Sequence, residues 1–168
     1  GGGVGGHCIP VDPWFLIESA ERESELFQLA RKINDGRPGI VVSKIESILG
    51  GVSGRRIAIL GLAYKPNVGD IRESPALEVV SLLSSMGADV TSFDPFVNGS
   101  GALGESVSTA TRDAELIVLC TQHDALLSVE AARSAVSAIS RIVLTTGASQ
   151  SMSGWAEQGF EVIGLYET

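Results

Sequence analysis

The stretch Arg56-Ile57-Ala58-Ile59-Leu60-Gly61-Leu62 decides the fold class of this chain. It is a continuous apolar run that is too short for a helix and ends in a loop, as expected for a strand buried on both faces. Further on, Ser74-Pro75 offers an N-cap and a first-turn proline for a helix over residues 75–86, and Gly87 would end it. A buried strand followed by a loop and a helix predicts a parallel sheet that binds ligands at the carboxyl ends of its strands.

The sequence after Gly87 repeats this alternation of strands and helices. Short runs rich in β-branched, aromatic and other apolar residues predict four further strands, at Val90–Phe93, Leu116–Cys120, Arg141–Thr145 and Val162–Leu165. Helices are predicted near Ala125–Ala138 and Ser151–Gln158, and Gly99–Gly104 is typical of a flexible loop. The order β-α-β-β-α-β-α-β predicts an α/β fold with a doubly wound, mainly parallel Rossmann-like sheet.

The residues before the sheet have a different character. A glycine-rich loop is followed by helical sequence at Trp14–Arg22 and Ser24–Asn34, and a third helix restarts at Arg37-Pro38. Three helices and a loop make a poor domain alone, so they resemble the end of a helical domain. We therefore divide the chain into residues 1–50 and a sheet domain at residues 55–168.

Composition excludes several classes of protein. The chain has 168 residues, 44% of them hydrophobic, enough for one full core. Twelve basic and twenty acidic residues give a net charge of -8, and without a basic stripe nucleic acid is a poor partner. No apolar run reaches the roughly 20 residues of a membrane span. Two distant cysteines argue against a secreted disulfide scaffold, so we expect a cytoplasmic protein and no metal site.

The first segment with candidate chemistry is GVGGHCIPVDPW, residues 3–14. Its glycines allow the backbone to approach a ligand closely and to take positive φ. Cys8 would lie near the start of a helix, where the helix dipole favours a thiolate. Asp12, four residues later, could reach the same pocket and handle a water or a proton. The alternative is a flexible terminus with an incidental thiol.

The second segment is the loop after the first strand, Leu60–Pro75. Lys65 and Arg72 would place two cations at the mouth of a parallel sheet, which suits a diphosphate. Gly61 stands alone here, so this loop lacks the G-x-G-x-x-G fingerprint. The alternative is a solvated loop in which Arg72 pairs with Asp70 or Glu73.

Both segments resemble the UDP-glucose/GDP-mannose dehydrogenase family, and so does the stretch Ala30–Asp35 with the Pro38 that follows it. The sequence of the first segment is most similar to those of the family branch that acts on UDP-N-acetylhexosamines, and on UDP-N-acetylmannosamine in particular. The UDP-glucose branch usually has Ser where His7 stands and Lys where Val11 stands.

This resemblance implies a four-electron oxidation of a sugar C6 alcohol to a carboxylate, with NAD as the cofactor used twice. Cys8 matches the family's nucleophile, which captures the aldehyde as a thiohemiacetal and then becomes a thioester. Asp12 matches the acid that assists water and proton handling. Holding the aldehyde covalently would stop it escaping between the two oxidations.

The resemblance also implies binding roles. Val4 and Gly5 match loop positions that touch the substrate, and Tyr64 and Lys65 match the segment lying against the UDP-sugar. Arg72 matches a residue that reaches toward NAD. The helical segment matches a domain that forms dimers, so a homodimer through residues 24–49 is expected.

The chain also departs from the family pattern. The amino-terminal domain that would bind most of the NAD is missing from it. Where members usually carry D-x-[RK]-G, this chain has Leu144-Thr145-Thr146-Gly147, which puts nucleotide binding by that loop in doubt. Two other hypotheses stay open: a UDP-glucose or GDP-mannose dehydrogenase, and a nucleotide-sugar-binding module without catalysis.

Four other residues have weaker functional signals. His7 could shape a pocket for an N-acetyl group or make a structural hydrogen bond. His123 is expected to anchor a loop, and Asp94 to cap a turn or face the nucleotide. Cys120 ends an apolar strand and is expected to be a small buried hydrophobe.

Overall fold

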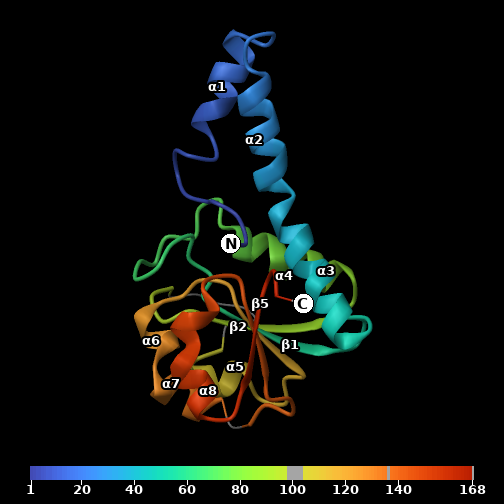
Figure 1. Cartoon of the computed structure of the whole chain (residues 1–168), viewed down its shortest axis with the longest axis vertical. Coiled ribbons are helices and arrows are strands. Elements are labelled where there is room, and N and C mark those ends of the chain that lie inside the picture. The colour runs from blue at the N-terminus through green and yellow to red at the C-terminus, as the bar shows by residue number, and fades with distance from the viewer. Residues whose placement is uncertain (98–103, 136, 168) are drawn as a thin grey trace.

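The structure is a computed structural model that describes residues 1–97, 104–135 and 137–167. Its centre is a five-stranded sheet in the order β2-β1-β3-β4-β5, in which every neighbouring pair is parallel (Figure 1). The strands are β1 (Arg56–Leu60), β2 (Asp89–Phe93), β3 (Leu116–Leu119), β4 (Ile142–Thr145) and β5 (Glu161–Gly164). The predicted fold class is confirmed. Of the loop predicted at Gly99–Gly104, all but Gly104 lies outside the described residues.

The apolar run in β1 is buried because both faces of the sheet are covered. Ile57 and Ile59 point into one hydrophobic core, whereas Ala58 and Leu60 point into a second core on the opposite face. This alternation follows from the two-residue period of a strand. A run of apolar residues without polar interruptions is therefore what a sheet between two helical layers requires.

One face is covered by α3 (Arg37–Leu49) and α4 (Pro75–Ser85). The other is covered by short helices: α5 (Val107–Ala110), α6 (Asp124–Leu127), α7 (Val129–Ser134), the 3-10 helix η1 (Ser149–Met152) and α8 (Ser153–Glu157). Trp155 is fully buried in that second layer, and its indole N–H donates to the Leu126 carbonyl at 2.8 Å. The two layers explain why β3, the central strand of the sheet, is apolar and buried at every residue.

Two sequence-based predictions about helices were wrong. A helix, α5, lies between β2 and β3, where we expected a direct strand-to-strand connection; its four residues follow the capping side chain of Ser106. The single helix predicted near Ala125–Ala138 is two helices, because Ser128 breaks it. Ser128 is extended, and its side chain accepts from the Ala131 N–H to cap α7.

Two helices before α3 project away from the sheet, α1 (Asp12–Ser19) and α2 (Glu25–Asp35) (Figure 1). No residue of α1 is buried, and large apolar side chains of both helices are exposed. In contrast, α3 contributes Val41, Val42 and Ile45 to the core beside β1. Among the described residues, no helix is long and apolar enough to cross a membrane.

The strand order places a topological switch point between β1 and β3. The chain runs from β1 to β2 on one side and then returns to place β3 on the other side of β1. Ligands of doubly wound sheets bind outside the carboxyl ends of the strands at such a point. The loop that begins at Gly61 and ends at Ser74 starts there.

Candidate active site

The thiol-bearing loop, residues 1–11, is tied to the helical segment by its backbone. The Val4 N–H donates to Asn34 Oδ1 at 2.7 Å, and Asn34 Nδ2 donates back to the Val4 carbonyl at 3.0 Å. The Arg37 guanidinium donates to the Gly1 carbonyl through two nitrogens, at 3.0 and 2.5 Å. Both side chains come from the junction of α2 and α3, so this junction fixes the path of the loop.

The same loop lies directly on the loop after β1. The Gly6 N–H donates to the Arg72 carbonyl at 3.0 Å. A Cβ atom on Gly5 would lie 2.2 Å from the Glu73 carbonyl oxygen, and one on Gly6, at φ +107°, would lie 2.9 Å from the Tyr64 ring. Gly5 and Gly6 are therefore required because only glycine permits this close approach. The two segments singled out in the sequence meet here.

Cys8 sits at the turn that leads into α1. Its carbonyl accepts hydrogen bonds from the Val11 and Asp12 N–H groups at 2.9 and 2.8 Å. Its side chain is exposed, and Sγ lies 3.1 Å from Nδ1 of His7. Asp12 is the exposed first residue of α1, joined to Cys8 through the backbone. A joint action of Cys8 and Asp12 stays a prediction.

The cationic side chains of the loop after β1 differ in their partners. Lys65 is exposed, with its Nζ 5.5 Å from the centre of the Tyr64 ring. The Arg72 guanidinium donates to both carboxylate oxygens of Asp70, at 2.6 to 3.1 Å. Hydrogen bonds from the Arg72 side chain and backbone hold the pKa of Asp70 at about 2. Arg72 therefore pairs with Asp70, which is the alternative that the sequence left open.

A buried pair, Asp94 and His123, holds this loop against the sheet. Asp94 Oδ2 accepts from the Leu62 and Ala63 N–H groups at 2.7 and 2.9 Å, and from His123 Nε2 at 2.9 Å. His123 Nδ1 accepts from the Asn67 N–H at 2.8 Å. The anchoring role expected for His123 is confirmed. Asp94 caps the turn after β2 by accepting from the Phe96 N–H.

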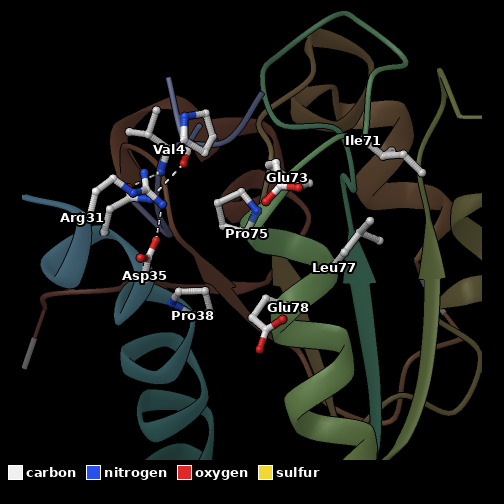
Figure 2. Close-up of a pocket in the computed structure, with 12 residues that line it drawn as sticks. Val4, Arg31, Asp35, Pro38, Ile71, Glu73, Pro75, Leu77 and Glu78 are labelled. Atoms are coloured by element: carbon white, nitrogen blue, oxygen red, sulfur yellow. Dashed lines mark hydrogen bonds and ion pairs between the residues drawn. The ribbon is translucent and has the colours of Figure 1, made fainter. Parts of the chain in front are cut away.

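A cavity of about 440 Å³ lies between the thiol-bearing loop, the α2–α3 junction and the start of α4 (Figure 2). Arg31, Asp35 and Val4 line one side, and Glu73, Pro75 and Glu78 line the other. Arg31 is buried and ion-paired with Asp35, while its Nε has no hydrogen-bond partner in the described part of the chain. With three carboxylates and one guanidinium, this cavity disfavours a diphosphate.

The carboxyl edge of the sheet beside β3 and β4 is covered by the chain itself. Gly2 packs on the side chain of Thr146, and a space of only about 50 Å³ remains among Gly2, Gly3, Tyr64 and their neighbours. Burial raises the pKa of the Cys120 thiol to about 12, so Cys120 is a poor nucleophile. Among the described residues, no group of three or more His, Cys, Asp or Glu side chains could hold a metal ion.

The chain is similar to proteins of one known family. The UDP-binding domain of the UDP-glucose/GDP-mannose dehydrogenase family matches residues 58–148. The chain belongs to this family. It is 37% identical to the UDP-N-acetyl-D-mannosamine dehydrogenase of Methanocaldococcus jannaschii over 165 residues, which is 96% of this chain but 38% of that protein.

Solved structures of the family are also similar. UDP-D-ManNAc dehydrogenase from Pyrococcus horikoshii superposes with a TM-score of 0.81 at 30% identity, covering 98% of this chain and 39% of that one. A UDP-glucose dehydrogenase from Pyrobaculum islandicum gives a TM-score of 0.80 at 26% identity, covering 100% and 39%. The chain thus spans less than half the length of these relatives.

Sequence reasoning did not predict two side-chain contacts around the thiol-bearing loop. Asn34 clamps the thiol-bearing loop through both of its amide atoms, although it was noted only as part of a family-like stretch. His7 contacts the thiol itself. The composition of the segment gave no signal for the Asn34 contact, because a side chain that bonds backbone thirty residues away is specified by the tertiary fold.

Proposed function

We propose that this chain is the thiol-bearing and UDP-binding part of an NAD-dependent UDP-N-acetylhexosamine 6-dehydrogenase. One observation carries the proposal. Gly5 and Gly6 bring the thiol-bearing loop into contact with the loop after β1, and the loop after β1 belongs to the family's UDP-binding domain. His7 and Val11, at positions where the UDP-glucose branch usually has Ser and Lys, favour an N-acetylhexosamine as the sugar.

The roles proposed for the chain's own residues follow from their positions. The Cys8 thiolate adds to the aldehyde carbon of the half-oxidised sugar, which keeps the intermediate on the enzyme. After the second oxidation, water attacks the resulting thioester, releases the carboxylate and frees the thiol, with Asp12 handling the proton. Val4, Gly5, Tyr64 and Lys65 are the proposed contacts to the UDP-sugar.

NAD would accept the hydride in each of the two oxidations. The chain offers few residues that fit this cofactor. The letters G-x-G-x-x-G do occur at Gly1–Gly6, but this segment is a loop packed on Thr146 and Pro75 and does not join a strand to a helix. Arg72 is the single contact to NAD that we propose from this chain, and it would have to share its guanidinium with Asp70.

We also propose a homodimer through the helical segment. Leu26, Leu29 and Ile33 form one stripe on α2, and they are 74%, 54% and 57% exposed. Side chains at this spacing lie on one helix face. An exposed apolar face of this kind is typical of a protein interface, and a second copy of the chain would bury it.

The test is catalysis by the parent protein, meaning the full dehydrogenase of which we propose this chain is a part. We expect Cys8→Ser to lower complete oxidation of UDP-N-acetylmannosamine at least about a hundredfold, because an alkoxyl nucleophile forms no thioester. Asp12→Asn should lower kcat about tenfold or more with little change in KM. NADH formation and the uronate product are measured together. UDP-glucose and GDP-mannose serve as competing substrates.

Wild-type turnover in the Cys8→Ser protein would contradict the covalent mechanism. Faster oxidation of UDP-glucose than of UDP-N-acetylmannosamine would favour the UDP-glucose alternative. UDP-sugar binding by the parent protein without any NADH formation would favour the third hypothesis, a binding module without catalysis.

A further inference from the structure

The dipeptide His7-Cys8 is held between two fixed points of the backbone. On one side, the Gly6 N–H is bonded to the Arg72 carbonyl at 3.0 Å. On the other, the Cys8 carbonyl accepts from the Asp12 N–H at 2.8 Å. Between these points, His7 Nδ1 lies 3.1 Å from Cys8 Sγ, within hydrogen-bond distance for sulfur. The contact between imidazole and thiol is therefore part of a constrained loop.

A charged side chain of suitable sign lies near each member of the pair: a carboxylate near His7 and a guanidinium near Cys8. The pKa of Asp70 is held at about 2, mainly by hydrogen bonds from Arg72 and in smaller part by the charge of His7. The pKa of Arg72 is raised, mainly by its hydrogen bond to Asp70, with a smaller contribution from Cys8. An imidazolium at His7 would thus be near a carboxylate, and a thiolate at Cys8 would be near a guanidinium.

We propose that His7 is a positioning residue that holds Cys8 as the thiolate. In this step the S–H bond of Cys8 breaks and the proton passes to His7 Nδ1, which leaves the electron pair on sulfur. The product is an imidazolium–thiolate pair, and no other reactant is needed. The inference rests on the proposed function, because it supplies the nucleophile that attacks the aldehyde.

Other charged groups lie near the pair. Lys65, beside the Tyr64 ring on which Gly6 packs, adds a positive charge that favours the thiolate. Asp12 follows at the start of α1, and Glu73 lies beside Gly5; both are exposed carboxylates that oppose a thiolate. These opposing charges are solvated and screened, whereas His7 is in direct contact with Sγ. His7 should therefore have the largest single effect on thiol reactivity.

The experiment measures alkylation of the 168-residue chain by iodoacetamide across pH, with the modified cysteine identified by peptide mass spectrometry. The wild-type chain is compared with His7→Gln, which keeps hydrogen-bonding groups but cannot take the proton. We expect His7→Gln to slow alkylation of Cys8 about tenfold near pH 7, with the two rates converging above about pH 9. His7→Ser should behave in the same way.

Cys120 provides an internal control in every sample. Cys120 is partly buried against the core beside β1, and burial raises the pKa of its thiol to about 12. Its alkylation should therefore be slow in the folded chain, and rapid alkylation of Cys120 would identify a variant that has unfolded. Superimposable pH–rate profiles for the wild-type chain and both folded variants would overturn the proposal. Because the assay contains neither NAD nor a UDP-sugar, that outcome would leave the proposed dehydrogenase activity intact, and loss of that activity would leave this result unchanged.

Discussion

Asp94 is the residue on which the geometry of the loop after β1 depends most directly. Its side chain is wholly buried and accepts hydrogen bonds from three backbone N–H groups and from His123. Because His123 Nδ1 already accepts from the Asn67 N–H, the ring proton must be on Nε2, where it is donated to Asp94. The His123 ring thus joins the loop after β1 to Asp94 through one acceptor and one donor.

We expect Asp94→Asn to lower the free energy of unfolding by about 2–4 kcal/mol at pH 7, because an amide cannot accept all four hydrogen bonds. Burial opposes ionisation of Asp94, but hydrogen bonds from His123 and the backbone outweigh it, and the net effect lowers the pKa. The carboxylate thus stabilises the fold above the unfolded pKa of about 3.9. This contribution is lost as pH falls through the lower folded pKa.

Urea denaturation at pH 7 and pH 3 measures both effects. The gap between wild type and Asp94→Asn should narrow at the lower pH. Asp89→Asn is the matched control, since Asp89 also belongs to the β2 region but forms an exposed ion pair with Arg56 and should change stability by less than about 1 kcal/mol. Equal losses in the two variants would show that the buried network does not stabilise the loop.

At this scale, the sequence predicted residue types better than contacts. The alternative pairing of Arg72 with Asp70 could be foreseen because the two residues are close in the sequence. The contact between His7 and Cys8 could not, because neighbouring side chains point in directions set by the fixed backbone on either side. The spacing of residues along the chain can be read from the sequence, whereas the direction in which a side chain points depends on the fold.

Among the elements, α3 connects the two predicted domains. It belongs to the helical segment by sequence, yet Val41, Val42 and Ile45 lie in the same core as β1. The division at residues 50–55 stays a prediction of domain organisation. From these contacts we expect a deletion ending at residue 50 to uncover the part of this sheet face that α3 covers, whereas a deletion ending at residue 35 would leave α3 in place.

We expect Ile45→Ala to lower the free energy of unfolding by about 2–4 kcal/mol, because Ile45 is fully buried and its loss leaves a cavity. Ile33→Ala, the same change on the exposed face of α2, should alter it by less than about 0.5 kcal/mol in dilute protein. Urea denaturation of both variants checks this. Equal stability of Ile45→Ala and wild type would mean that α3 is not part of the cooperative unit.

Strands were easier to predict than short helices. Strands β1, β3, β4 and β5 are mostly apolar runs, and β2 has β-branched and aromatic residues at Val90, Thr91 and Phe93. Each predicted strand range agrees with the structure to within two residues. In contrast, α5 has only four residues and is defined by the Ser106 cap. Hydrophobic periodicity cannot reveal a helix of one turn, because one turn contains no repeat.

The exposed stripe on α2 gives a prediction about self-association. Replacing Leu29 and Ile33 together by Glu places two like charges at the centre of the proposed interface and should abolish the dimer. Sedimentation velocity over a range of protein concentrations measures it. The control is Lys32→Glu, one residue away in sequence on a different helix face. A wild-type chain that is monomeric at high concentration would contradict the homodimer.

At the scale of the whole molecule, the carboxyl edge of the sheet contacts the thiol-bearing loop and is also where we propose that the nucleotide binds. Gly2 already covers Thr146 at the carboxyl edge, and the usual Asp and basic residue of the family are replaced at Leu144 and Thr146. Of the two cations that the sequence predicts for a diphosphate, Arg72 is shared with Asp70, so we propose that the exposed Lys65 makes most of this contact. Affinity for the nucleotide should be correspondingly low.

We therefore expect the 168-residue chain to bind UDP only weakly, with a dissociation constant of about 1 mM. We also expect it to form no NADH from UDP-N-acetylmannosamine and NAD. Such a dissociation constant corresponds to about 4 kcal/mol of binding, and we expect no more because a single exposed cation would hold a solvated diphosphate. For NAD, the described residues provide no glycine-rich turn between a strand and a helix. Titration calorimetry with UDP, GDP and NAD measures binding, and absorbance at the NADH band measures activity.

Two lysine variants test where UDP binds. Lys65→Ala should remove the heat signal of UDP binding. Lys44→Ala should keep it, because Lys44 Nζ donates to the Glu167 carbonyl, far from Lys65 in the sequence. NADH formation by the purified chain would show that its own residues complete a cofactor site, and UDP binding that persists in Lys65→Ala would move the nucleotide away from the loop after β1.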